Sequence, residues 1–398
     1  MESITSNSTN EGNSQPQGVI FSLSSLYAHL QRIQDQRKRR GIRYTLVSIL
    51  AVVILAKLCG QDRPYAIADW AQNRSEFLVE ILRLKRSRLP HHTTYRRILE
   101  TVLDGDKFEQ LMSDFIQHCP QVGQEVVIAI DGKTLRGTIT REDPFGLHLL
   151  AAYLPGEGIV LLQMVVEQEK ENEIVVAPQL LKSVDLRQKV VVADAMHAQR
   201  GLSLQITQAG GDFIWIIKDN QLTTRQAIEL LFTPQKPLAG EGRPPLDFRQ
   251  ARTVDKGHGR LEERTLTISS LLNEYLDWPG VAQVFKLERR FTNLATDEVE
   301  QEVRYGLTSL SSTKAGPERL MNIVRSQWGI ENGLHYRRDV TFHEDATRMT
   351  HKAAGRAMAT INNLICNLLA IQGFTNFAQA RRFFDAHPQR AVDLILGL

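Results

Sequence analysis

The sequence contains 398 residues, of which 42% are hydrophobic and 23% charged, and its formal net charge at pH 7 is +3. This composition is that of an ordinary globular protein and excludes a largely disordered chain, while the length predicts two or three domains. The three cysteines, Cys59, Cys119 and Cys366, are far apart and show no CxxC or Cys/His spacing. We therefore expect a reduced cytoplasmic chain without disulfides or structural zinc.

The first part of the chain changes from polar to helical in character. Residues 1–20 are rich in Ser, Asn, Gln and Gly, and we expect a disordered tail. Residues 21–120 are expected to form an all-helical domain with helices at Leu26–Arg39, Tyr44–Leu58, Ala66–Asn73 and Thr93–Leu103. The apolar run Leu46–Leu58 is too short to span a membrane and contains Lys57, so we interpret it as a buried helix.

This N-terminal region carries an excess of positive charge. Between residues 21 and 120 there are 16 Lys and Arg residues against 10 Asp and Glu. Much of the excess lies in two clusters, Arg37-Lys38-Arg39-Arg40 and the group Arg83, Lys85, Arg86 and Arg88. Solvated helix faces often have this composition, and a polyanion-binding surface has it too. The helix that carries Arg96 and Arg97 is therefore either part of a DNA-reading unit or part of an ordinary helical domain.

From Val122 onward the pattern changes to strands. Three apolar runs, Val126–Ile130, Leu147–Leu154 and Ile159–Val166, predict an antiparallel meander. A helical segment, the strand Lys189–Ala193, a second helix and the strand Asp212–Ile217 follow. This order predicts a mixed five-stranded sheet with flanking helices, in which right-handed crossovers bring the first and fourth strands together in parallel.

An aspartate follows each of these two strands. Asp131 comes directly after Val126–Ile130, and Asp194 comes directly after Lys189–Ala193. Taken alone, Asp131-Gly132 is typical of a turn. Because the two strands are expected to be parallel neighbours, both carboxylates would emerge at the same edge of the sheet. Ligand sites in such sheets form at this edge, at the carboxyl ends of the strands. A shared divalent metal ion then explains the pair better than two turn caps.

Residues 220–316 are expected to form a β-rich insertion with one solvated face, because several segments alternate apolar and polar residues. These segments are Asp247–Val254, Arg264–Ser269, Val281–Phe291 and Val299–Leu307. Gly257-His258-Gly259-Arg260 forms a basic corner in the insertion. This corner either contacts phosphate or is a solvated turn.

A helix begins at Pro317 and is predicted to continue to Arg338. At helical spacing, one face carries Trp328, Glu331, His335 and Arg338. Such a face fits a functional site, and it also fits a surface helix with an ion pair between Glu331 and His335. Gly329 and Gly333 weaken a helix, so we expect them to serve close packing.

Six motifs resemble those of bacterial insertion-sequence transposases. They are Asp131-Gly-Lys-Thr-Leu-Arg, Lys170-Glu-Asn-Glu-Ile, Val192-Ala-Asp194-Ala-Met-His-Ala-Gln, Lys218-Asp-Asn-Gln, Gly257-His-Gly-Arg-Leu-Glu and Trp328-Gly-Ile-Glu331-Asn-Gly-Leu-His-Tyr. The resemblance runs from about residue 21 to residue 372, in consistent order. The sequence resembles the DDE enzymes with a ribonuclease-H-like core, and within them the branch that contains the H-repeat-associated proteins of Rhs elements.

The resemblance implies that Asp131, Asp194 and Glu331 are the catalytic residues and the metal ligands. They would hold two Mg²⁺ ions about 4 Å apart, with Mn²⁺ able to substitute and no organic cofactor. The expected DNA contacts, each of which also has a structural reading, are Lys133, Arg136, Lys218, Arg260, Arg325, Trp328, His335 and Arg338. Of the frame Tyr-x2-Arg-x3-Glu-x6-Lys found in better-studied relatives, only Glu331 and the positive charge at Arg338 are kept, since Val324 and Gln327 occupy the first two positions.

The expected organisation and function follow from the resemblance. Residues 121–219 and 317–372 would form the catalytic core, 220–316 the insertion and 373–398 a C-terminal helical tail. The protein would be a transposase in the bacterial cytoplasm, nucleoid-associated when bound to DNA. It would cleave and join double-stranded DNA at terminal inverted repeats and target sites, as a homodimer or larger assembly and without a membrane. The alternatives are a catalytically dormant DNA-binding protein and a structure-selective nuclease on the same fold.

Overall fold

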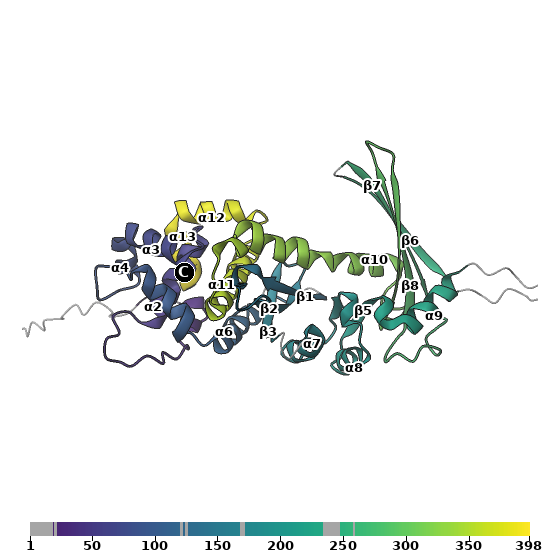
Figure 1. Cartoon of the computed structure of the whole chain (residues 1–398), viewed down its shortest axis with the longest axis horizontal. Coiled ribbons are helices and arrows are strands. Elements are labelled where there is room, and N and C mark those ends of the chain that lie inside the picture. Colours follow the sequence, from purple (N-terminus) through teal and green to yellow (C-terminus); the bar gives the residue numbers. More distant parts are fainter. Residues whose placement is uncertain are drawn as a thin grey trace, which may run out of the picture.

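The computed structural model describes residue 19 and residues 22–119, 122–123, 126–167, 172–233, 247–257 and 259–398. Most of the expected N-terminal tail, together with residues 170–171 and 258 of two motifs, lies outside the described residues. The described strands form one sheet in the order β3-β2-β1-β4-β5-β9-β8-β7-β6. A helical lobe lies at one end of this sheet, and strands β6 to β9 form a long arm at the other (Figure 1).

The first five strands form the core of the sheet, as predicted. They are β1 (Val127–Leu135), β2 (Leu147–Leu154), β3 (Ile159–Val166), β4 (Val190–Ala193) and β5 (Asp212–Ile217). Strand β1 pairs antiparallel with β2 and parallel with β4, which in turn pairs parallel with β5. Most residues of these strands are buried, which explains their continuous apolar runs. The prediction that the first and fourth strands are parallel neighbours is confirmed.

The arm consists of β6 (Arg249–Gly257), β7 (Arg260–Ser269), β8 (Gln283–Asn293) and β9 (Val299–Thr308). It is not a separate insertion sheet, because β9 pairs antiparallel with β5 and extends the predicted five strands to nine. Gly306 allows this junction: a Cβ at this position would lie 2.4 Å from the carbonyl oxygen of Trp215 and 2.2 Å from the ring of Phe285. The arm strands are therefore continuous with the strands of the core.

Helices connect the strands and lead away from the arm. The crossover helices are α7 (Glu173–Lys182) and α8 (Arg200–Gln208), and α9 (Leu222–Phe232) precedes the arm. Short 3-10 turns are η2 (Arg136–Thr138), η3 (Ala195–His197), η4 (Asp219–Gln221) and η7 (Asp345–Thr347). After the arm come α10 (Pro317–Ser326), two wide-turn π-helical segments, η5 (Ile330–His335) and η6 (Arg337–Thr341), and α11 (Lys352–Ile371), which packs on β3.

The helical lobe contains segments from both parts of the chain. Its elements are α1 (Leu26–Leu30), α2 (Leu46–Leu58), α3 (Pro64–Asn73), α4 (Ser75–Ile81), α5 (His92–Arg97), η1 (Ile98–Val102), α6 (Gly105–Gln117), α12 (Phe377–Ala386) and α13 (Pro388–Leu396). Every residue of α2 except Val47 is buried, and α13, α12 and α11 all contact this helix. The prediction of a buried helix here is confirmed. Within the described residues, none of the helices has the length and hydropathy needed to cross a membrane.

The helix predicted at Leu26–Arg39 is much shorter than expected. It ends at Leu30, and the basic cluster that begins at Arg37 lies in the loop before α2. The backbone N–H and the guanidinium of Arg37 both bind the carboxylate of Asp35, and the guanidinium also donates to the carbonyl of Tyr44 at 2.9 Å. These side-chain bonds hold a turn in place of further helix.

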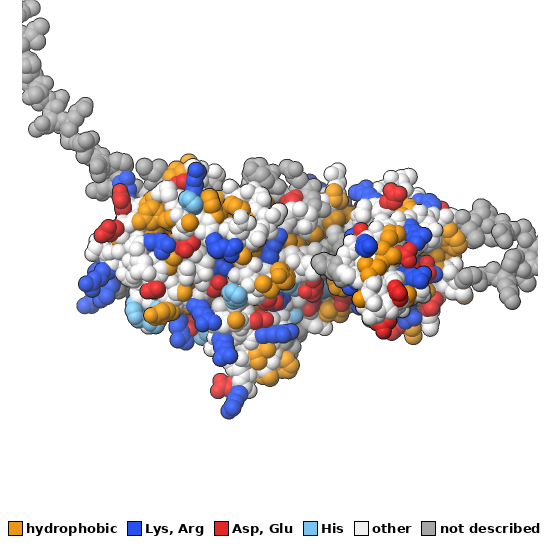
Figure 2. Space-filling view, turned by 90° about the horizontal axis from the view of Figure 1, so that it is seen from above, with side chains coloured by type: hydrophobic (Ala, Val, Ile, Leu, Met, Phe, Trp, Pro, Cys, Tyr) orange, Lys and Arg blue, Asp and Glu red, His pale blue; other side chains and the backbone are white. Residues whose placement is uncertain are grey.

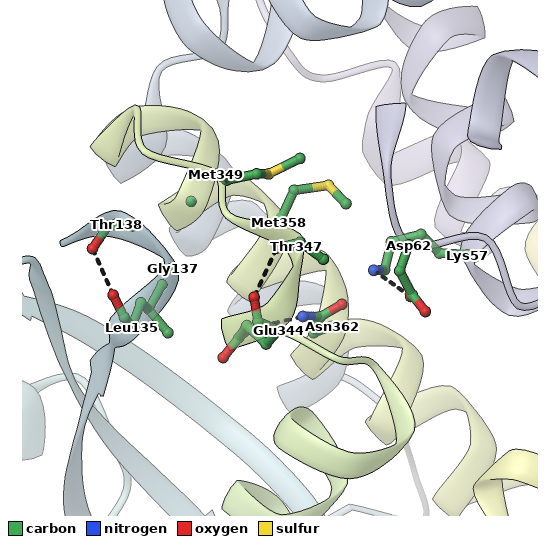
Figure 3. Close-up of a pocket in the computed structure, with 11 residues that line it drawn as sticks. Lys57, Asp62, Leu135, Gly137, Thr138, Glu344, Thr347, Met349, Met358 and Asn362 are labelled. Atoms are coloured by element: carbon green, nitrogen blue, oxygen red, sulfur yellow. Dashed lines mark hydrogen bonds and ion pairs between the residues drawn. The ribbon is translucent and has the colours of Figure 1, made fainter. Parts of the chain in front are cut away.

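A group of buried and half-buried polar residues, the polar seam, joins the helical lobe to the core, and Figure 3 draws all its members except Arg381. The polar seam consists of Lys57, Asp62, Arg381, Glu344 and Asn362. The ammonium of Lys57 lies 2.9 Å from Asp62, and Arg381 donates to the same carboxylate at 2.6 Å. Burial lowers the pKa of Lys57, although the negative charge of Asp62 opposes the shift. Glu344 and Asn362 line the same small cavity as Lys57 and Asp62, and the amide of Asn362 donates to Glu344 at 2.8 Å.

Candidate active site

Two aspartates lie at equivalent positions on the adjacent parallel strands. The register between β1 and β4 ends with the pair Ile130 and Ala193, so Asp131 and Asp194 each follow the last paired residue. Asp194 caps η3, where its Oδ1 accepts from the N–H of Ala195 at 2.7 Å. Strand β1 continues past Asp131 to Leu135, which excludes the turn as the explanation for Asp131.

Glu331 approaches Asp131 from the segment that follows the arm. Asp131, Glu331 and His335 each present a ligand atom, and these three atoms lie within 4.8 Å of one another. The Nδ1 atom of His335 is 3.6 Å from Glu331 Oε2 and 3.7 Å from Asp131 Oδ2. Asp194 is outside this three-residue group but lines the same cleft, which has a volume of about 290 Å³. The cleft lining is Ile130, Asp131, Asp194, Ile216, Lys218, Arg304, Gln327, Trp328, Ile330 and Glu331.

The charge balance of the cleft is unfavourable for a protein without a bound cation. Burial, together with the negative charges of Glu331 and Glu173, raises the pKa of Asp131 to about 7. Burial, together with the positive charges of Arg338 and Lys133, lowers the pKa of His335 to about 3, so this imidazole is neutral. Its Nε2 atom has no hydrogen-bond partner in the described part of the chain. Carboxylate oxygens and a neutral imidazole form a donor set that fits a divalent metal ion.

The helix that carries Glu331 differs from the predicted continuous α-helix. Helix α10 ends at Ser326, and the chain continues in π-helical turns from Ile330. Close packing explains the two glycines, because a Cβ at Gly329 would lie 2.7 Å from Cβ of Pro155. A Cβ at Gly333 would lie 2.5 Å from the hydroxyl of Tyr153. The expectation of close packing is confirmed, and a widened turn at a functional position is a recognised pattern.

Three residues that were not predicted as site residues lie beside Asp131. The carboxylate of Glu173, the first residue of α7, lies 2.8 Å from Nε2 of His148 and 3.1 Å from Nε2 of His197. Burial alone would raise the pKa of Glu173, but the hydrogen bonds with both histidines outweigh it and lower the pKa to about 2. Glu173 belongs to the motif Lys170-Glu-Asn-Glu-Ile and His197 to the motif that begins at Val192, and these motifs were the sequence signals for this cluster.

Of the predicted DNA contacts, Lys218 and Trp328 line the cleft. The ammonium of Lys218 lies 3.4 Å from Oδ1 of Asp194 and is well exposed. Trp328 is half exposed, and the guanidinium of Arg304 lies 5.6 Å from the centre of its ring. Arg304, on β9, was not predicted, because its place in the cleft depends on the pairing of β9 with β5.

The other predicted contacts lie outside the cleft lining. Lys133 is nearly buried and binds Asp339 at 2.7 Å. Arg136 is exposed, and its backbone N–H donates to Asp345 at 2.9 Å. On the arm side, Arg325 lies 3.2 Å from Asp255, and Arg260 lies over the ring of Phe291 at 5.4 Å from its centre.

His335, another predicted DNA contact, is buried beside Asp131 and Glu331 and does not line the cleft. Arg338 is also a predicted DNA contact that the geometry does not support. Its side chain is 1% exposed, and its Nε atom donates to Glu344 of the polar seam at 2.9 Å. The π-helical turns carry it away from the cleft side of the helix and into the interior. We therefore correct its assignment from phosphate contact to buried ion pair.

The chain matches two family models and several known proteins. Residues 123–368 match the family described as Transposase DDE domain, and residues 27–116 match the one described as DDE_Tnp_1-associated. The chain is 28% identical over 354 residues to the H repeat-associated protein YhhI of Escherichia coli (strain K12), covering 87% of this chain and 90% of that protein. It is 31% identical over 279 residues to a protein of the dhlA 3′ region of Xanthobacter autotrophicus, covering 69% of this chain and 91% of that protein.

One solved structure is similar over most of the chain. A piggyBac transposase synaptic complex with hairpin DNA covers 94% of this chain and 80% of that chain, with 13% sequence identity and a TM-score of 0.41. This similarity is too distant to support a comparison of sites. The match to the Transposase DDE domain spans more than half of the chain, and Asp131, Asp194 and Glu331 lie within the matched residues. The chain belongs to the DDE transposase family, in the branch that includes the H repeat-associated proteins.

Proposed function

We propose that this protein cleaves phosphodiester bonds at the ends of an insertion sequence and joins the 3′ ends to target DNA. Its family implies use of a divalent metal ion and binding to DNA. The observation that carries the proposal is the single cleft lined by Asp131, Asp194 and Glu331. Three carboxylates converging on one cleft are the ligand set of enzymes that transfer phosphodiester bonds with metal ions.

We assign metal binding to these three carboxylates. When bound, two Mg²⁺ ions would supply Lewis-acid stabilisation of the attacking and leaving oxygens. The raised pKa of Asp131 supports this assignment, because it reflects burial of this carboxylate beside the negative charges of Glu331 and Glu173. The buried neutral imidazole of His335 lies beside Asp131 and Glu331, with Nδ1 3.6 Å from Glu331 and 3.7 Å from Asp131.

Basic and aromatic side chains at the cleft would hold the DNA strand. Lys218 and Arg304 offer positive charge to phosphate oxygens, and Trp328 offers a half-exposed ring on which a displaced base can stack. Arg304 already lies over the ring of Trp328, so the two can act together on one nucleotide. In this proposal Arg338 has no contact with DNA.

The helical lobe would bind the element end through two neighbouring loops. The hydroxyl of Tyr44 donates to the carbonyl of Arg88, which connects the loop before α2 to the loop before α5. Both loops expose basic side chains, including Arg39, Arg40 and Arg86. Figure 2 shows many Lys and Arg side chains over the helical end of the molecule. These loops, in place of a basic recognition helix, form the proposed electrostatic footprint.

Simultaneous replacement of Arg39, Arg40 and Arg86 by Ala is expected to reduce the salt dependence of DNA binding. If each residue neutralises one phosphate, the slope of log K against log salt concentration becomes shallower by about three. Fluorescence anisotropy measures the affinity for duplex DNA at salt concentrations between roughly 50 and 200 mM, the range over which phosphate contacts weaken strongly. Arg187→Ala, an exposed arginine beside Asp185, is the control and should leave the slope nearly unchanged.

The proposed function is tested with purified protein and labelled duplexes that carry an element end, in Mg²⁺ or Mn²⁺. We expect nicks at the end of the element and covalent products in which its 3′ end is joined to a second duplex. Nicks without joining would identify a structure-selective nuclease. Binding without any cleavage would identify a dormant DNA-binding protein, and size-exclusion analysis of the DNA complex would test for a homodimer or larger assembly.

A further inference from the structure

Glu173 lies at the meeting point of three elements that position the site. It is the first residue of α7, and its side chain is 14% exposed. One carboxylate oxygen binds Nε2 of His148 on β2, and the other binds Nε2 of His197 in η3. A carboxylate only accepts hydrogen bonds, so both imidazoles donate to it through these nitrogens.

The first of these contacts reaches the strand that carries Asp131. A Cβ at Gly132 would lie 2.2 Å from Oε1 of Glu173 and 2.6 Å from Nε2 of His148. Glycine is therefore required directly after Asp131, so that Glu173 and His148 can lie against the β1 backbone. On its other side, Nδ1 of His148 lies 2.8 Å from the hydroxyl of Thr134, its partner across β1 and β2. His148 therefore connects Glu173 to β1 through the side chain of Thr134, three residues after Asp131.

The second contact reaches the turn that carries Asp194. His197 is buried, and its backbone N–H donates to the carbonyl of Asp194 at 2.9 Å. Holding the His197 ring therefore fixes the turn in which Asp194 is the capping residue. Glu173 thus packs against the β1 backbone at Gly132 and is hydrogen-bonded to His197 in the turn that follows β4.

We propose that Glu173 is a positioning residue that sets the spacing of Asp131 and Asp194 for metal binding. Both of its oxygens are bound to imidazoles, so it is not a ligand itself and acts on the two aspartates through His148, Gly132 and His197. Partners of this kind, which orient metal ligands, commonly change metal affinity by 10- to 100-fold when mutated. The inference rests on the proposed function, because it takes Asp131 and Asp194 as metal ligands.

Glu173→Gln is expected to weaken Mn²⁺ binding by about tenfold. The amide can accept from only one imidazole, because its NH₂ group faces the other. Mn²⁺ binding is measured by calorimetric titration of the full chain without DNA, after circular dichroism has shown that the variant is folded. Glu318→Gln is the matched control, since Glu318 is an exposed glutamate in the first turn of α10 and should bind Mn²⁺ as the parent does.

Glu173→Asp distinguishes a positioning role of Glu173 from a role of its charge alone. It also provides the test of the positioning role if the Gln variant does not fold. Aspartate keeps the negative charge but is too short to reach both imidazoles, so we expect it also to weaken Mn²⁺ binding. Parental Mn²⁺ affinity in folded Glu173→Asp, or in folded Glu173→Gln, would overturn the inference. A purely structural role would lower the unfolding temperature without changing the Mn²⁺ affinity of the folded protein.

Asp131→Asn distinguishes this failure from failure of the proposed function. If Asp131→Asn loses Mn²⁺ binding while the Glu173 variants keep it, the proposed function stands and the role of Glu173 is wrong. If Asp131→Asn binds Mn²⁺ as the parent does, the metal site of the proposed function is itself wrong.

Discussion

Asp131→Asn is expected to lower the rate of Mg²⁺-dependent DNA cleavage by about a thousandfold, which corresponds to about 4 kcal/mol of lost transition-state stabilisation. Asn keeps the size of the side chain but removes the charge of the most enclosed carboxylate in the cleft, which is 24% exposed. Several kcal/mol is the usual contribution of a metal ion to the stabilisation of developing charge. Single-turnover cleavage of a labelled element end, at saturating Mg²⁺, measures the effect.

A pH series on the same variant separates loss of a ligand from loss of the fold. In the folded metal-free protein the pKa of Asp131 is raised to about 7 from 3.8, so the folded state keeps this proton longer than the unfolded state. The parent's free energy of unfolding therefore falls as pH rises from about 4 to 7 through this group, and Asn removes that dependence. Urea denaturation without metal should find the variant at least as stable as the parent at pH 8.

Asp277→Asn is the matched control for the cleavage measurement. Asp277 is exposed and outside the cleft lining, so its variant should cleave at the parental rate. Parental activity in Asp131→Asn would remove Asp131 from the site. Lost activity together with a large loss of stability at pH 8 would show that Asp131 has a structural role.

Glu344→Gln is expected to lower the free energy of unfolding by about 3 kcal/mol. Glu344 is the charge partner of Arg338, and the two side chains are only 6% and 1% exposed. Gln can still accept from Asn362, so the substitution mainly leaves the buried guanidinium without a counter-charge. Breaking one side of a buried ion pair is far more costly than replacing the pair by apolar groups. Urea denaturation at pH 7, with the slope of the transition compared with the parent's, measures the change.

The double variant Arg338→Met with Glu344→Leu is the informative companion, because it removes both charges and should recover most of the stability. These variants also test the revised role of Arg338. If Arg338→Met kept the parental stability and instead reduced the affinity for DNA and its salt dependence, Arg338 would be a phosphate contact after all.

The sequence was sufficient to predict the core of the sheet and the shared edge of two carboxylates. Continuous runs such as Val126–Ile130 indicate buried strands, and right-handed crossovers leave few ways to arrange them. The position of Asp131 relative to Asp194 follows from that topology alone. Glu331 was brought to them by the resemblance to a family, since no pattern in the sequence relates a residue after the arm to a strand before it.

The features that could not be predicted depend on contacts between distant segments. The sequence pattern predicted an α-helix through Arg338, whereas packing of Gly329 against Pro155 and of Gly333 against Tyr153 accompanies a wider helical turn. The same change directs Arg338 into the interior. Glu173 was not singled out, because its importance comes from two histidines on separate segments.

The shared packing of the helical lobe has a consequence for biosynthesis. Helix α2 is apolar on all sides, yet its partners α12 and α13 are translated only after the whole sheet and arm. On the ribosome, the nascent chain therefore contains an apolar helix whose packing is incomplete through most of synthesis. The packing of the helical lobe is completed only when residues 377–396 emerge. Truncated products that end before α12 would retain the cleft residues but expose the part of α2 that packs on α12 and α13, which makes them targets for chaperones, proteases and aggregation.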